Sequence, residues 1–167
     1  AEPDRDRFNL KLDYNAPRGG LLAGLAGADR AIRLGLGGKG SWRRWDGALL
    51  AEADGKRLAA LQLTNRAGAY GVLGMAWPEG MLAGLAARAA GTSVAISANG
   101  TFSDRVLDGD ARVIGEGLAL QARGGVDLAG NAVRTMAIIA EARDPERLFP
   151  GIRLEEAKLT GTLDGPF

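Results

Sequence analysis

Residues 34–45 (LGLGGKGSWRRW) hold the types and spacing that come nearest to a chemical motif. Gly35, Gly37 and Gly40 fit the G-x-G-x-x-G spacing of a dinucleotide-binding turn, with Lys39 placed where a phosphate group would bind. Such a turn requires a parallel βαβ unit around it, and here strand-like segments follow one another. A P-loop is excluded because Lys39 precedes Gly40 and not Ser or Thr. We therefore interpret these glycines as a turn between strands and not as a nucleotide site.

Carboxylates offer the second candidate for chemistry. Asp46, Glu52 and Asp54 lie close together in the sequence, yet Asp54-Gly55 is a turn dipeptide and the others suit solvated strand edges. The chain has no Cys and no His, which removes thiol nucleophiles, imidazole bases and the usual zinc ligands. We therefore expect no catalytic residue, no metal site and no cofactor, and we interpret the chain as a non-enzyme.

The charge balance bears on the class of partner. There are 21 Lys and Arg residues against 20 Asp and Glu, a net charge of +1, which argues against nucleic acid as a partner. Hydrophobic residues make up 46% of the chain, but only 5% is aromatic and 26 residues are Gly. The apolar content is therefore mainly Leu, Ala and Val.

Alternation of apolar and polar residues predicts a mainly β protein. In residues 8–14, every second side chain is apolar, which is typical of a half-buried strand. Similar stretches predict nine further strands, at residues 31–36, 58–63, 69–77, 92–98, 111–114, 117–122, 126–128, 132–142 and 157–163. Residues 64–68 and 121–125 are interpreted as hairpin turns.

Two or three short amphipathic helices are predicted between the strands. Residues 17–26 and 78–87 both begin with Pro, place apolar residues at helical spacing, and end near Gly27 and Gly91. Residues 144–152 form a third and more degenerate candidate.

These segments recur, which predicts a repeat of about 60 residues. The alignments are 21–26 with 81–86 and 40–42 with 100–102, both offset by 60 residues, and 45–47 with 107–109, offset by 62. The predicted units are 17–77, 78–144 and a partial third at 145–167. We therefore expect a single piece of a longer array.

The apolar side of such a sheet must be covered. A second sheet would give a sandwich, whereas a long antiparallel sheet curled into a half-pipe would leave an apolar trough for acyl chains. The residues alone leave both possibilities open. The predicted liners of the trough are Phe8, Leu10, Leu12, Tyr14, Ile32, Leu34, Leu36, Leu61, Leu63, Leu73, Met75, Trp77, Val94 and Ile96.

The order of these features resembles the repeat unit of the TamB family and, more broadly, the AsmA-like group. The resemblance rests on the Pro-initiated Leu-Leu-Ala-Gly-Leu segment at 17–25, the strand at 32–36, and the Trp-containing segments at 38–42 and 45–47. It extends from Phe8 to Phe167. The second unit departs from the pattern, with Phe102 and Leu107 at the two Trp positions.

The resemblance implies a function. Members of this family are anchored in the inner membrane and cross the periplasm as a long curled sheet, so the anchor is expected outside this segment. Their apolar groove is thought to carry phospholipid between the inner and outer membranes, and an outer-membrane partner of the BamA-like (TamA) type binds the full-length protein. An alternative is an interaction module whose free sheet edges pair with client strands and assist the assembly or secretion of outer-membrane β-barrel proteins.

Overall fold

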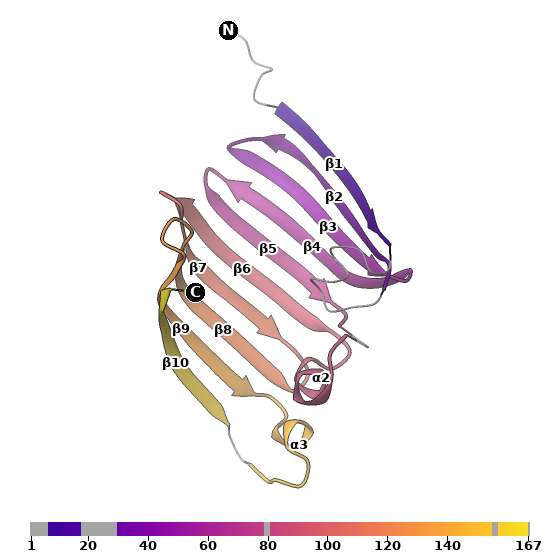
Figure 1. The fold of residues 1–167 in the computed structure, drawn as a ribbon, viewed down its shortest axis with the longest axis vertical. Coiled ribbons are helices and arrows are strands. Elements are labelled where there is room, and N and C mark those ends of the chain that lie inside the picture. The colour runs from indigo at the N-terminus through magenta and orange to yellow at the C-terminus, as the bar shows by residue number, and fades with distance from the viewer. Residues whose placement is uncertain (1–6, 18–29, 79–80, 155–156, 167) are drawn as a thin grey trace.

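The chain forms one antiparallel sheet of ten strands in a computed structural model that describes residues 7–17, 30–78, 81–154 and 157–166. Each strand pairs with its neighbours in the sequence, so the sheet is a simple meander from β1 to β10 (Figure 1). The strands are β1 (Arg7–Ala16), β2 (Ile32–Ser41), β3 (Arg44–Ala53), β4 (Lys56–Arg66), β5 (Ala69–Ala76), β6 (Val94–Ser103), β7 (Val106–Ile114), β8 (Leu118–Asp127), β9 (Ala132–Ala142) and β10 (Lys158–Pro166). The described helices are α2 (Gly84–Ala90) and α3 (Pro145–Leu148).

The prediction of a mainly β, antiparallel fold is confirmed, but the expected curl is not seen. The sheet is neither strongly curled nor closed (Figure 1). Strong curvature requires bulges or glycine kinks repeated along the strands. Here the register shifts only between β3 and β4, between β8 and β9, and between β9 and β10.

Tight turns join several of the strands. The pairs Asp54-Gly55, Ala67-Gly68 and Asp104-Arg105 all have positive φ at both residues, as two-residue hairpins of the mirror-image turn type require. The predicted turn at residues 54–55 is therefore confirmed, whereas the turn predicted at 64–68 is limited to Ala67 and Gly68, because β4 continues to Arg66.

Three predictions about the strands are wrong. Residues 37–40 are not a glycine turn but continue the strand predicted at 31–36 as part of β2, and the turn falls at Trp42 and Arg43. The segment Arg44–Ala53, for which no strand was predicted, is the strand β3. Residues 121–125 are not a hairpin turn, because they continue β8 through a register shift at Gly124.

The strands recur at a nearly constant spacing. β2, β3 and β4 begin at residues 32, 44 and 56, and β6, β7 and β8 each begin 62 residues later. An offset of 62 residues therefore aligns the strands of the two units. The 60-residue offset that paired Trp42 with Phe102 does not, because Trp42 lies in a turn and Phe102 lies within β6.

The two described helices lie side by side at one end of the sheet (Figure 1). The predicted helix at 78–87 is displaced toward its C-terminal end: Pro78 forms a turn with Met81, and α2 ends at Gly91, whose φ is 70°. In α3, the side chain of Asp144 caps the helix by accepting a hydrogen bond from the backbone N–H of Arg147. The predicted helix at 17–26 lies outside the described residues, apart from Pro17.

Hydrogen bonds and an ion pair attach both helices to the turn between β7 and β8. Glu116 in this turn accepts hydrogen bonds from the backbone N–H and the hydroxyl of Thr92, at 2.8 and 2.6 Å, and pairs with Arg147 of α3 at 2.6 Å. The hydroxyl of Thr92, then its backbone N–H and the charge of Arg147, hold the pKa of Glu116 below its usual value. Arg88 of α2 donates to the backbone carbonyl of Leu148 at 3.2 Å, so the helices are also linked directly.

The protein has very little core. Among the described residues, the buried hydrophobic side chains are Ala16, Ile32, Ala51, Ala53, Ala90, Ala119 and Leu148. Five of these seven are alanines, and several much larger apolar side chains are exposed. The described part of the chain is therefore a single-layer sheet, and no second sheet covers it.

Candidate functional site

The sheet has one face that is almost free of charge. Residues directly opposite one another in antiparallel strands lie on the same face, so the register carries each face from strand to strand. We call the face that bears Leu12 of β1 and its partner Leu36 the apolar face, and the other the polar face. One row of directly paired residues crosses all ten strands on the apolar face: Leu12, Leu36, Leu49, Leu61, Gly74, Ile96, Val113, Leu120, Ala140 and Leu159.

Charged residues lie on the polar face. Of the charged residues that are paired with a residue of a neighbouring strand, all lie on the polar face except Lys56 at the β3–β4 turn. Examples are Lys39 opposite Asp46 and Asp110 opposite Arg123. The segregation is therefore maintained across the whole width of the sheet.

Most of the predicted trough residues lie on the apolar face. They are Leu10, Leu12, Tyr14, Ile32, Leu34, Leu36, Leu61, Leu63, Val94 and Ile96. The side chain of Phe8 is not among those that the structure describes.

The prediction is wrong for Leu73, Met75 and Trp77. The pairing of Leu73 with Gln62 and Ser97 places Leu73 and Met75 on the polar face. Trp77 follows β5 and lies against Arg57, with the guanidinium carbon 5.7 Å from the ring centroid. The cause is that β5 carries apolar residues at both alternating sets of positions, so its own pattern does not say which set faces the apolar side.

The register also adds residues that the sequence pattern missed. Val72 pairs with Leu63 and Tyr70 pairs with Asn65, so this other set of β5 lies on the apolar face. Further larger additions include Leu49, Val113, Leu120, Ile138 and Leu159. Only the pairing with neighbouring strands identifies them.

The apolar face is open to solvent. Leu12 is 51% exposed, Leu120 is 40% exposed and Leu159 is 71% exposed. Soluble proteins rarely expose large contiguous apolar areas unless these contact a ligand, a membrane or another protein. The face is therefore the candidate functional site.

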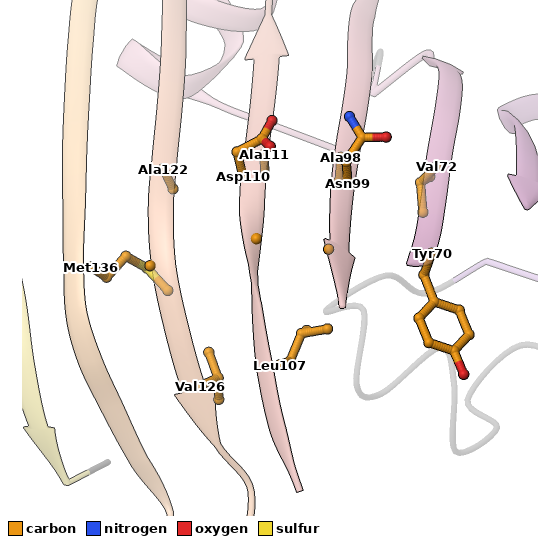
Figure 2. A pocket seen from close by; sticks show the side chains of 13 residues that line it. Tyr70, Val72, Ala98, Asn99, Leu107, Asp110, Ala111, Ala122, Val126 and Met136 are labelled. Carbon is orange, nitrogen blue, oxygen red and sulfur yellow. The ribbon is translucent and has the colours of Figure 1, made fainter. Parts of the chain in front are cut away.

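A shallow hollow of about 300 Å³ lies in the apolar face over β6, β7 and β8 (Figure 2). Its floor is made of small residues, and its rim of larger apolar ones from β7 and β8 themselves and from the flanking strands β5 and β9. The floor consists of Ala98, Gly100, Gly109, Ala111, Ala122 and Gly124, and the rim of Tyr70, Val72, Leu107, Val126 and Met136. We call this the Gly100 hollow. Asn99 and Asp110 also border it, but the register places both on the polar face.

A second hollow, of about 420 Å³, lies where the helices meet the sheet. Leu118 and Ala140 of the apolar face contribute to it, together with Leu85 of α2 and Phe149 after α3. Along β8, only Leu120 separates Leu118 from Ala122 of the Gly100 hollow. The two hollows are thus neighbours on one apolar surface.

The residues first considered for chemistry lie elsewhere. Gly35, Gly37 and Gly40 are part of the extended strand β2 and form no loop around a phosphate group. Asp46 forms an ion pair with Arg66, and Asp54 accepts a hydrogen bond from the backbone N–H of Ala31 at 3.3 Å. Within the described ranges there is no group of three acidic, Cys or His residues that suits a metal ion.

Asp127 also has a lowered pKa. The backbone N–H of Gly130, followed by Arg134 and the backbone N–H of Ala129, holds the pKa of Asp127 below its usual value. Asp127 lies at the end of β8 on the polar face, where these bonds close the turn into β9. Its role is therefore to shape this turn.

The known proteins give no further assignment. No protein-family model, curated protein or solved structure matches this chain. None of the helices in the described segments has the length and hydropathy needed to cross a membrane.

Proposed function

We propose that this chain is a section of a TamB-like protein of the periplasm whose apolar face shields acyl chains during phospholipid transport between the inner and outer membranes. The observation that carries the proposal is the row of paired apolar residues that crosses all ten strands on a face almost free of charge. Shielding of acyl chains needs no covalent chemistry, so we propose no catalytic residue, metal or cofactor.

The dimensions of the face suit this role. Ten strands spaced about 4.8 Å apart give an apolar row of roughly 43 Å. One leaflet of a bilayer core is roughly 15 Å thick, so the row can hold more than one acyl chain in succession. Contact with the face removes CH₂ groups from water, which is worth about 0.8 kcal/mol for each group buried.

We also propose that this chain is one part of a longer array of repeated units. The 62-residue spacing of the strands supports units of four strands, close to the predicted units 17–77 and 78–144. In the full-length protein such units would extend the sheet and its apolar face. A membrane anchor and a BamA-like (TamA-type) outer-membrane partner are proposed for parts of the protein beyond this segment.

A second candidate function uses the edges of the sheet. β1 and β10 are the outer strands, and Leu159 and Leu163 of β10 are 71% and 52% exposed. An exposed edge strand can pair with an extended client segment, as in assistance to outer-membrane β-barrel proteins. The charge segregation across the inner strands favours the lipid role, because edge pairing does not require it.

Native mass spectrometry of the chain after incubation with phosphatidylethanolamine vesicles tests the proposal. We expect complexes that carry one or more intact phospholipids, because the apolar face offers continuous contact to acyl chains. The matched control is the same incubation with glycerophosphoethanolamine, which has the headgroup and no acyl chain. Binding of both molecules alike, or of neither, would contradict the proposal.

A further inference from the structure

In the first unit, the side chain of Trp45 fills the space above a pair of glycines on neighbouring strands. Gly38 of β2 and Gly47 of β3 are directly paired on the apolar face, and Trp45 precedes Gly47 by two residues on the same side. A β-carbon built on Gly38 would lie 2.3 Å from Nε1 of Trp45, and one built on Gly47 would lie 2.5 Å from Cζ2. The indole therefore covers both glycines at contact distance, in the manner of an aromatic ring packed over strand glycines.

The second unit has the same glycine pair without the ring. Gly100 and Gly109 are also directly paired on the apolar face, and each lies 62 residues after its counterpart in the first pair. The residue in the position of Trp45 is Leu107. A β-carbon on Gly100 would come no nearer to Leu107 than 3.5 Å, and the three atoms nearest to one on Gly109 are all backbone atoms. The Gly100 hollow occupies the space where an indole would lie.

We propose that the Gly100 hollow binds a planar, uncharged ring system carried by a small-molecule ligand. The first unit provides the evidence for the shape of the occupant, because there the same floor holds an indole. A flat ring makes contact with a glycine floor over its whole face, whereas a flexible acyl chain has no such complementarity. The inference goes beyond the proposed acyl-chain role and does not depend on it.

The surroundings of the hollow suit such a ring. Tyr70 borders it from β5 and can meet the edge of a bound ring, while Met136 reaches toward β8 from the opposite side (Figure 2). The side chain of Asp110, the one charged residue that borders the hollow, belongs to the polar face. A charged ring would therefore lose its hydration without gaining a partner, which selects for an uncharged one.

A fluorescence titration with 1-aminoanthracene, an uncharged planar probe, tests the inference in three proteins. The unaltered chain is expected to bind the probe at one site. Leu107→Trp places an indole on the second glycine pair and is expected to weaken binding by roughly tenfold or more. Trp45→Leu opens the first pair and is expected to give a second site of similar affinity.

Two controls keep the outcome decisive. Asp108→Trp places the same indole on the polar face, where Asp108 pairs with Thr101 and Gly125, and is expected to keep the affinity within about twofold, whereas a general loss of packing would affect it as much as Leu107→Trp. Circular dichroism melting checks that each variant is folded, and the two Trp variants act in opposite directions, so either alone decides the matter. Absence of probe binding to the unaltered chain, or equal binding by Leu107→Trp, would overturn the inference. Phospholipid binding measured in parallel shows whether the acyl-chain proposal fails separately.

Discussion

Replacing Ile96 with Glu is expected to reduce phospholipid binding at least about tenfold while the sheet stays folded. Ile96 lies on the apolar face in the middle of the sheet, between Gly74 of β5 and Val113 of β7. In the free protein the new carboxylate reaches water, because no second sheet covers this face in the described part of the chain. Under a bound acyl chain the same carboxylate would be buried without a partner, which costs several kcal/mol.

Ser97→Glu is the matched control for this prediction. Ser97 is the next residue of β6 and lies on the polar face, opposite Arg112. The same charge introduced there is expected to leave phospholipid binding unchanged. Binding is measured by native mass spectrometry over a range of lipid concentrations, with melting curves for both variants. Equal losses in the two variants would show that the apolar face is not the binding surface.

Gly38→Val is expected to destabilise the protein by about 2 kcal/mol. The added β-carbon would fall within 2.3 Å of the indole of Trp45, so the ring must leave the glycine pair. Displacement of this ring exposes one of the few aromatic side chains of the chain and removes its contact with both strands. Part of this cost is offset because valine favours strands more than glycine does.

Gly37→Val separates the clash from the general effect of losing a glycine. Gly37 is the preceding residue of β2, and a β-carbon on it would have no atom within 4 Å. This variant is therefore expected to be neutral or slightly stabilising. In urea denaturation, adding Trp45→Ala to Gly38→Val should cost less than the sum of the two single changes. Additive costs would contradict the account of the glycine pair.

The alternation of side chains predicted most of the fold but not the faces of every strand. Residues 8–14 were predicted as a strand because one set of alternate positions is clearly apolar, and β1 lies there. β3 was missed because Leu49 and Leu50 are adjacent, so neither face stands out. β5 was assigned the wrong face for the same reason. Only hydrogen bonding to neighbouring strands resolves such cases, and that information is not local.

The glycine segment shows a second limit of sequence patterns. Glycines in residues 35–40 are typical of a turn when read alone, but the structure has them within β2. One of them, Gly38, makes room for a ring that comes from Trp45 of the next strand. Gly38 is not part of the G-x-G-x-x-G spacing, and Gly37, which is, would have no atom within 4 Å of an added β-carbon, so the spacing does not reflect a phosphate-binding loop.

Photo-crosslinking from two adjacent positions tests the central claim most directly. Leu120 lies on the apolar face of β8 and Gln121 on the polar face, so p-benzoylphenylalanine at these positions samples the two faces at the same place in the sheet. In the presence of phosphatidylethanolamine vesicles, we expect phospholipid adducts from position 120 and almost none from position 121. Adducts at both positions in equal yield, or peptide adducts only, would contradict an apolar face that shields acyl chains.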